Sequence, residues 1–69
     1  MKIKTKKTVK PKAKVIGKDG NVFNLLGICQ RSLRAANQED KAVELRERVW
    51  GAGSYSEALS IMGEYCTLH

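Results

Sequence analysis

The chain has 69 residues, a hydrophobic fraction of 42% and a formal net charge of +6. This length allows one domain at most and excludes an enzyme that needs a second domain or a large enclosed pocket. The longest apolar run is far shorter than the 18 residues of a membrane-spanning helix, and the basic amino end is not followed by the apolar region of a secretory signal. We therefore expect a cytoplasmic location, the usual setting for a chain without either signal.

The positive charge is concentrated at the amino end. The first eighteen residues contain eight lysines and no acidic residue, whereas the other fifty-one contain five basic and seven acidic side chains. Residues 1–14 have too few apolar side chains to offset the entropy lost on ordering. We predict a flexible, lysine-rich arm over residues 1–14 and a folded domain over residues 15–69. The arm's lysines are Lys2, Lys4, Lys6, Lys7, Lys10, Lys12 and Lys14.

Residues 15–23 contain two short apolar pairs that flank an Asp-Gly step, Asp19-Gly20. Asp-Gly favours the positive φ angles of tight hairpin turns, so we predict a short β-hairpin here. Asn24 is the predicted N-cap of a first helix over residues 25–36, whose apolar residues recur every three or four positions. Asn37 follows as a residue that tolerates the left-handed conformation at a helix end.

A second helix is predicted over residues 39–50, with acidic residues at its amino end as the helix dipole favours. Gly51 and Gly53 stop it. Ser54 and Glu57 then have the spacing of a capping box, which starts a third helix over residues 55–66. The predicted fold is mainly α: a short β-hairpin followed by a three-helix bundle, with a disordered basic arm at the amino end.

The residues that carry catalytic or metal chemistry are sparse. Cys29 and Cys66 fall among apolar residues at helical spacing, which favours two small buried side chains, although a disulfide between them stays open. His69 is the one histidine, and with the two cysteines it lacks the spacing and the fourth ligand of a zinc site. The serines have no histidine base near them in the sequence. We expect no enzyme activity, no metal and no cofactor.

The large aromatic side chains give two alternatives for the folded domain. Phe23 and Tyr65 lie in core-like contexts, while Trp50 and Tyr55 flank the loop that contains Gly51 and Gly53. Small cores depend heavily on large rings, so all four rings can form a packed mini-core. If Trp50 and Tyr55 are exposed instead, they are the candidate contacts for a protein partner.

The basic residues suggest a second kind of partner. Clustered lysines neutralise phosphates and give salt-dependent affinity for nucleic acid. Arg31 and Arg34 on the first helix extend this candidate surface, and the alternative is that arm and helix are simply solvated. A helix-turn-helix reader of DNA is disfavoured, because Glu39 and Asp40 lie where a recognition helix would meet the bases.

Two segments together resemble a known group of proteins. They are DGNVFNLLG (residues 19–27) and GSYSEAL (residues 53–59). The chain is similar over residues 15–65 to small uncharacterised proteins of bacteriophages and of integrative or conjugative elements, especially in Gram-positive bacteria. The resemblance leaves out the lysine-rich arm. It implies an accessory product of a mobile element that binds a host or element protein, and it implies no mechanism.

The leading hypothesis is therefore a non-enzymatic interaction protein whose helical body binds a protein and whose arm adds electrostatic contact. The alternative is a small nucleic-acid-binding module that grips phosphates through the arm and the first helix. The sequence also leaves open a homodimer, because so small a core gains stability from a second copy.

Overall fold

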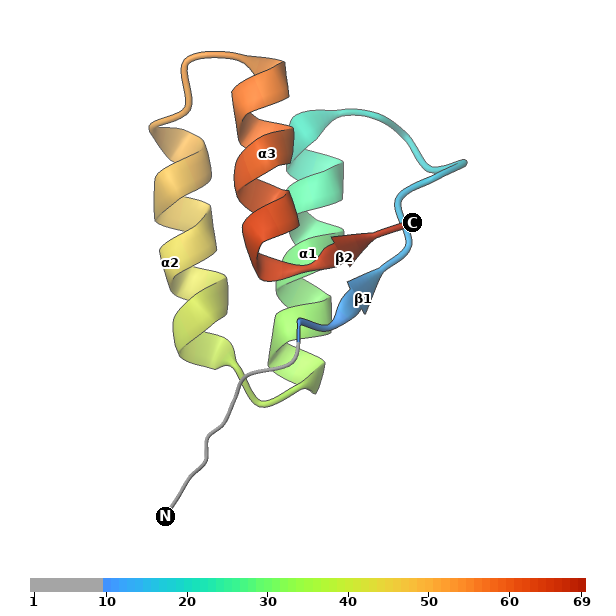
Figure 1. Ribbon diagram of the computed structural model, residues 1–69, viewed down its shortest axis with the longest axis vertical. Coiled ribbons are helices and arrows are strands. Elements are labelled where there is room, and N and C mark those ends of the chain that lie inside the picture. Colours follow the sequence, from blue (N-terminus) through green and yellow to red (C-terminus); the bar gives the residue numbers. More distant parts are fainter. Residues whose placement is uncertain (1–9) are drawn as a thin grey trace.

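The computed structural model describes residues 10–69. It contains three helices and two short strands within this range, which confirms the mainly helical fold. Helix α2 runs antiparallel to both α1 and α3, and the three pack against one another (Figure 1). The elements are β1 (Lys12–Ala13), α1 (Val22–Ala35), α2 (Glu39–Trp50), α3 (Tyr55–Tyr65) and β2 (Thr67–Leu68).

The core lies between the three helices and is built from the apolar stripe of each one. Its largest fully buried side chains include Leu33 of α1, Leu45 of α2 and Met62 of α3. Cys29 and Cys66 are also buried and unbridged, as their apolar surroundings predicted. Over residues 10–69, each helix is either too short or too polar to cross a membrane.

The two strands form a parallel pair that joins the two ends of the described chain. Lys12 pairs with Thr67 and Ala13 with Leu68. The Thr67 N–H donates to the Pro11 carbonyl at 2.8 Å, and the His69 N–H donates to the Ala13 carbonyl at 3.0 Å. All three helices lie between the two strands in the sequence. They form the long crossover connection that a parallel pair of strands requires.

The hairpin predicted over residues 15–23 is not formed. The chain turns at Gly17, whose φ is +83°, and α1 begins at Val22 rather than after Asn24. The Asp19 carboxylate accepts from the Asn21 N–H at 3.0 Å, and the Asn21 side chain caps α1 by accepting from the Phe23 N–H at 2.8 Å. Short polar side chains thus satisfy the local backbone donors that a hairpin ladder would have used.

The end of α1 and the start of α3 have the capping residues that were predicted from the sequence. Asn37 has a φ of +62° just after α1, and the Gln38 N–H donates back to the Leu33 carbonyl at 2.8 Å, which together form a Schellman end. At the start of α3, the Ser54 hydroxyl accepts from the Glu57 N–H at 3.1 Å. The Glu57 carboxylate reaches back to the N–H of Gly53 at 3.0 Å, one residue before the cap.

The boundary predicted after Lys14 lies too late in the chain. Ala13 is buried in the core and belongs to β1, and the Lys10 ammonium donates to the Gly63 carbonyl at 2.9 Å. Residues 10–14 are therefore part of the folded unit, because strand pairing with β2 orders them. The remainder of the predicted arm, residues 1–9, lies outside the described residues.

Candidate functional site

Three exposed aromatic side chains gather at one end of the bundle. Phe23 is 55% exposed, Trp50 62% and Tyr55 49%. They line one groove of about 330 Å³, whose apolar lining also includes the buried side chains of Val49 and Ala58. We call Phe23, Trp50 and Tyr55 the aromatic surface. The mini-core of four packed rings is therefore not formed, since only Tyr65 is buried.

The aromatic surface exists because three helix ends meet. The start of α1, the end of α2 and the start of α3 lie at the same end of the bundle (Figure 1). The Asn21 cap places Phe23 in the first turn of α1, and the Ser54 cap makes Tyr55 the first residue of α3. Trp50 is the last residue of α2, before Gly51 ends that helix. Local capping signals in the sequence thus determine where the rings lie.

Two contacts fix the positions of the rings that line the groove. The rings of Phe23 and Trp50 are tilted by 46° with their centroids 5.2 Å apart, a favourable aromatic geometry. The Tyr55 hydroxyl donates to the Gly20 carbonyl at 2.6 Å, which ties α3 to the loop before α1. Within residues 10–69 the indole N–H of Trp50 has no hydrogen-bond acceptor. The groove therefore offers two ring walls and an available donor.

Sequence reasoning identified Trp50 and Tyr55 and placed Phe23 in a core-like context. The error follows from the predicted hairpin, which assigned Phe23 to a strand. On a helix that begins at Val22, each residue advances about 100° around the axis, so Phe23 lies roughly 100° from the centre of the buried stripe. If Asn21 had been recognised as the N-cap of α1, Phe23 would have been placed in the first helical turn, away from the buried stripe.

The basic candidates are dispersed by comparison. Lys12 and Lys14 are exposed and flank the buried Ala13, as the alternation of a strand requires. Arg31 is exposed on α1, whereas the Arg34 guanidinium bonds both carboxylate oxygens of Glu39, at 3.1 and 3.2 Å. That ion pair neutralises one of the two predicted phosphate contacts. Lys10 bonds the Gly63 carbonyl, and Lys2, Lys4, Lys6 and Lys7 lie outside the described residues.

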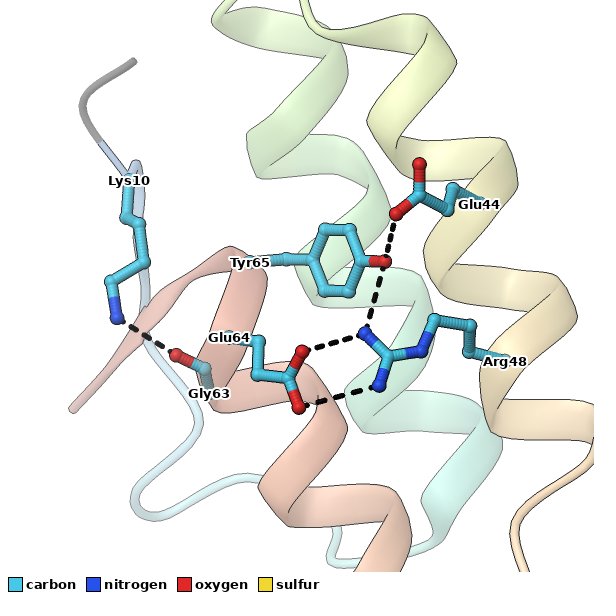
Figure 2. Close-up of polar contacts among 6 residues, drawn as sticks. All are labelled: Lys10, Glu44, Arg48, Gly63, Glu64 and Tyr65. Atoms are coloured by element: carbon cyan, nitrogen blue, oxygen red, sulfur yellow. Dashed lines mark hydrogen bonds and ion pairs between the residues drawn. The ribbon is translucent and has the colours of Figure 1, made fainter. Parts of the chain in front are cut away.

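A polar network connects α2 to α3 on another part of the surface (Figure 2). The Arg48 guanidinium binds both carboxylate oxygens of Glu64, at 2.6 and 3.3 Å, and also donates to the Tyr65 hydroxyl at 3.3 Å. The Tyr65 hydroxyl in turn donates to Glu44. The Arg48 hydrogen bond lowers the pKa of the Glu64 carboxyl, and burial raises the pKa of Tyr65.

This network borders a polar depression of about 300 Å³, whose lining includes Lys10, Lys41 and Glu64. Most of its side chains are engaged within the fold: Arg48 with Glu64, Glu44 with Tyr65, and Lys10 with the main chain. Charges that satisfy one another in this way stabilise the contact between two helices.

The two thiols, of Cys29 and Cys66, are buried in the core of the fold. The Cys66 thiol lies 3.6 Å from the Cys29 carbonyl oxygen and donates to it. Burial, aided by the neighbouring Cys66, raises the pKa of Cys29 to about 12, so the thiol is protonated and weakly nucleophilic at neutral pH. Over residues 10–69 no cluster of three histidine, cysteine or acidic side chains has the arrangement of a metal site.

The aromatic surface thus combines three exposed rings with an apolar groove. In comparisons with known proteins, no family model, curated protein or solved structure matches this chain. The inference about function therefore rests on the geometry of the chain itself.

Proposed function

We propose that this chain is a non-enzymatic interaction protein that binds a protein partner through the aromatic surface. The observation that supports the proposal is the exposure of Phe23, Trp50 and Tyr55 around one apolar groove. In keeping with the resemblance of residues 19–27 and 53–59, we further propose that it is an accessory product of a phage or mobile element.

The exposure of these rings has a cost that recognition can explain. The chain has four large aromatic side chains, and the fold buries one of them, Tyr65. Burying a large apolar side chain stabilises a fold by about 1.5–3 kcal/mol, which matters for so small a core. Tryptophan and tyrosine are the residues that most often dominate binding energy at protein interfaces. Three rings left at one end of the bundle therefore favour a binding surface.

The lysines at the amino end would contribute differently from the rings. Exposed positive charges act over several ångströms, increase the rate of encounter with an acidic partner and lose this effect at high salt. We therefore propose that the aromatic surface determines which protein is bound, while the lysines accelerate association.

Affinity capture with matched variants tests the proposal. The full chain and its Trp50→Ala variant are each used to capture proteins from cells that carry the gene. Ile16→Ala serves as the control, because Ile16 is 73% exposed and lies outside the groove. A specific partner should be retained by the wild type and Ile16→Ala and lost by Trp50→Ala. Equal capture by all three chains would contradict a role for the aromatic surface.

The second candidate function is nucleic-acid binding. The observation that favours it is the exposure of Lys12 and Lys14, which continue the lysine-rich sequence into the folded unit. Binding of a duplex of arbitrary sequence, measured by fluorescence anisotropy, should then weaken steeply with salt. A chain with Lys12 and Lys14 changed to glutamine should show a smaller salt slope. Absence of binding at low salt would rule this candidate out.

A further inference from the structure

We infer that the occupant of the groove is a proline-rich segment of the partner, bound in the extended polyproline II conformation. The inference rests on the proposed function and specifies its ligand. Polyproline II segments dock on grooves lined by aromatic rings, and they are already extended before binding, so little entropy is lost. The size, the walls and the polar groups of the groove each support this ligand.

The aromatic surface alone is too small for a stable interface with a second copy of the chain. At 49–62% exposure, each of the three rings presents about 100 Å² of surface, or about 300 Å² in total. A stable protein–protein interface buries about 800 Å² on each partner. The rings supply less than half of this area, so they suit a narrow ligand that inserts a few side chains.

The walls of the groove favour an extended ligand over a helix. A helix is about 10–12 Å across with its side chains and needs a row of apolar pockets spaced over two turns. This groove holds about 330 Å³ and is lined by the contacting rings of Phe23 and Trp50 and by Tyr55. Flat proline rings pack against aromatic rings, and three residues per turn bring every third residue to the same side of the ligand.

The polar groups that line the groove favour a ligand without N–H groups. The Trp50 indole N–H is an available donor, and the Ser54 hydroxyl accepts from Glu57 and keeps its own hydrogen. Of the residues in the described range, no aspartate, glutamate, asparagine or glutamine lines this groove. The side-chain acceptors in the lining are the hydroxyls of Ser54 and Tyr55, so an ordinary peptide would bury more backbone N–H groups than these two can accept, which is costly. Proline has a carbonyl to accept and no N–H to leave unsatisfied.

Peptide titrations on the full chain test the inference. The probes are a capped decaproline, a Gly-Ser peptide of equal length and an amphipathic helical peptide. Trp50 is the one tryptophan of the chain, so its fluorescence and its indole N–H resonance report directly on the groove. Decaproline should shift both signals in a saturable manner, and the Gly-Ser peptide should bind at least 10-fold more weakly.

Variants then separate the ring from its donor. Trp50→Phe keeps an aromatic ring and removes the N–H, whereas Tyr55→Ala removes a second ring of the groove. Each variant should weaken decaproline binding at least 10-fold by calorimetry, with Ile16→Ala unchanged. Circular dichroism shows which variants fold, and either folded variant suffices for the comparison. Equal binding of decaproline and the Gly-Ser peptide would overturn the inference.

The outcomes also distinguish this inference from the proposed function. If the helical peptide shifts the Trp50 signals and decaproline does not, the polyproline inference is wrong and protein binding at the aromatic surface stands. If no peptide binds and Trp50→Ala still captures the same partner as the wild type, both are wrong.

Discussion

The buried Cys29 thiol makes the fold sensitive to alkaline pH in a way that can be calculated. Burial raises its pKa from 9.0 to about 12, so in the folded chain the thiol stays protonated while in the unfolded chain it ionises above about pH 9. The unfolded state then binds fewer protons than the folded state, and the free energy of unfolding falls as pH rises. This stability is fully present below pH 9 and is lost between pH 9 and 12.

The magnitude follows from the two pKa values. Each unit of pH between them removes about 1.4 kcal/mol, which gives losses of about 1.4 kcal/mol at pH 10 and about 2.7 kcal/mol at pH 11. Such a loss is large for a domain of this size, whose total stability is a few kcal/mol. Other groups of the chain also respond to alkaline pH, so the contribution of the Cys29 thiol has to be isolated by comparison.

Urea unfolding of the wild type and of Cys29→Ala, at pH 8, 9, 10 and 11 with a reductant present, makes that comparison. The variant leaves a small cavity, and the stability cost of that cavity does not depend on pH. The difference in unfolding free energy between the two chains should therefore shrink by about 1.4 kcal/mol per pH unit above pH 9. A difference that stays constant from pH 8 to pH 11 would refute the assignment of a buried, protonated thiol.

Three further perturbations probe the core, a loop contact and a surface ion pair. Leu45→Ala should destabilise the fold by about 2–5 kcal/mol in urea, because the side chain is fully buried. Tyr55→Phe removes the hydrogen bond to the Gly20 carbonyl and should cost about 1 kcal/mol, seen as a melting temperature lowered by about 4–8 °C. Glu64→Gln should lower the melting temperature at neutral pH and low salt, and 1 M salt should remove the difference. Because Arg48 holds the pKa of Glu64 below its usual 4.5, the wild type should lose this advantage as the pH falls below about 4.5, where the melting curves of the two chains should converge.

The parts of the fold that are encoded locally were predictable from the sequence. The second helix has the predicted bounds, and Ser54 caps the third helix at the predicted position. Both depend on residues within four positions of each other, such as Ser54 and Glu57. The left-handed Asn37 at the end of α1 belongs to the same class, because side-chain chemistry and backbone geometry act on neighbouring residues.

Contacts between distant residues were not predictable in the same way. Strands β1 and β2 have two residues each and pair across 55 positions, so neither contains enough of an alternating pattern to indicate a strand. Glu44 and Arg48 are four residues apart on α2, a spacing that favours an ion pair within one helix. Both residues instead contact α3: Glu44 bonds Tyr65, and Arg48 bonds Glu64. Tertiary packing determined the strand pairing and the partners of Glu44 and Arg48. Residue spacing along the sequence could not show that residues of α3 would lie nearest to them.

The candidate site shows both effects together. The caps at Asn21 and Ser54 are local, yet the groove forms only because packing brings the ends of three helices to one place. Trp50 and Tyr55 were identified because they flank one loop. Phe23 is 27 residues before Trp50, and its place beside that ring follows from the packing of α1 on α2.

The contacts that stabilise this fold differ from the side chains that we assign to partner binding. Of residues 10–69, thirteen hydrophobic residues are buried, and one of them, Tyr65, is aromatic. The helix ends and the strand pair are held by backbone hydrogen bonds and short polar caps. None of these contacts involves the ring of Trp50. Trp50→Ala removes the ring contact with Phe23, a kind of pair that contributes about 0.5–1.5 kcal/mol to stability. Removing a tryptophan anchor from an interface typically costs about 2 kcal/mol or more of binding energy. A large loss of stability in Trp50→Ala would show that the ring serves the fold, and it would remove the main reason for assigning the aromatic surface to a partner.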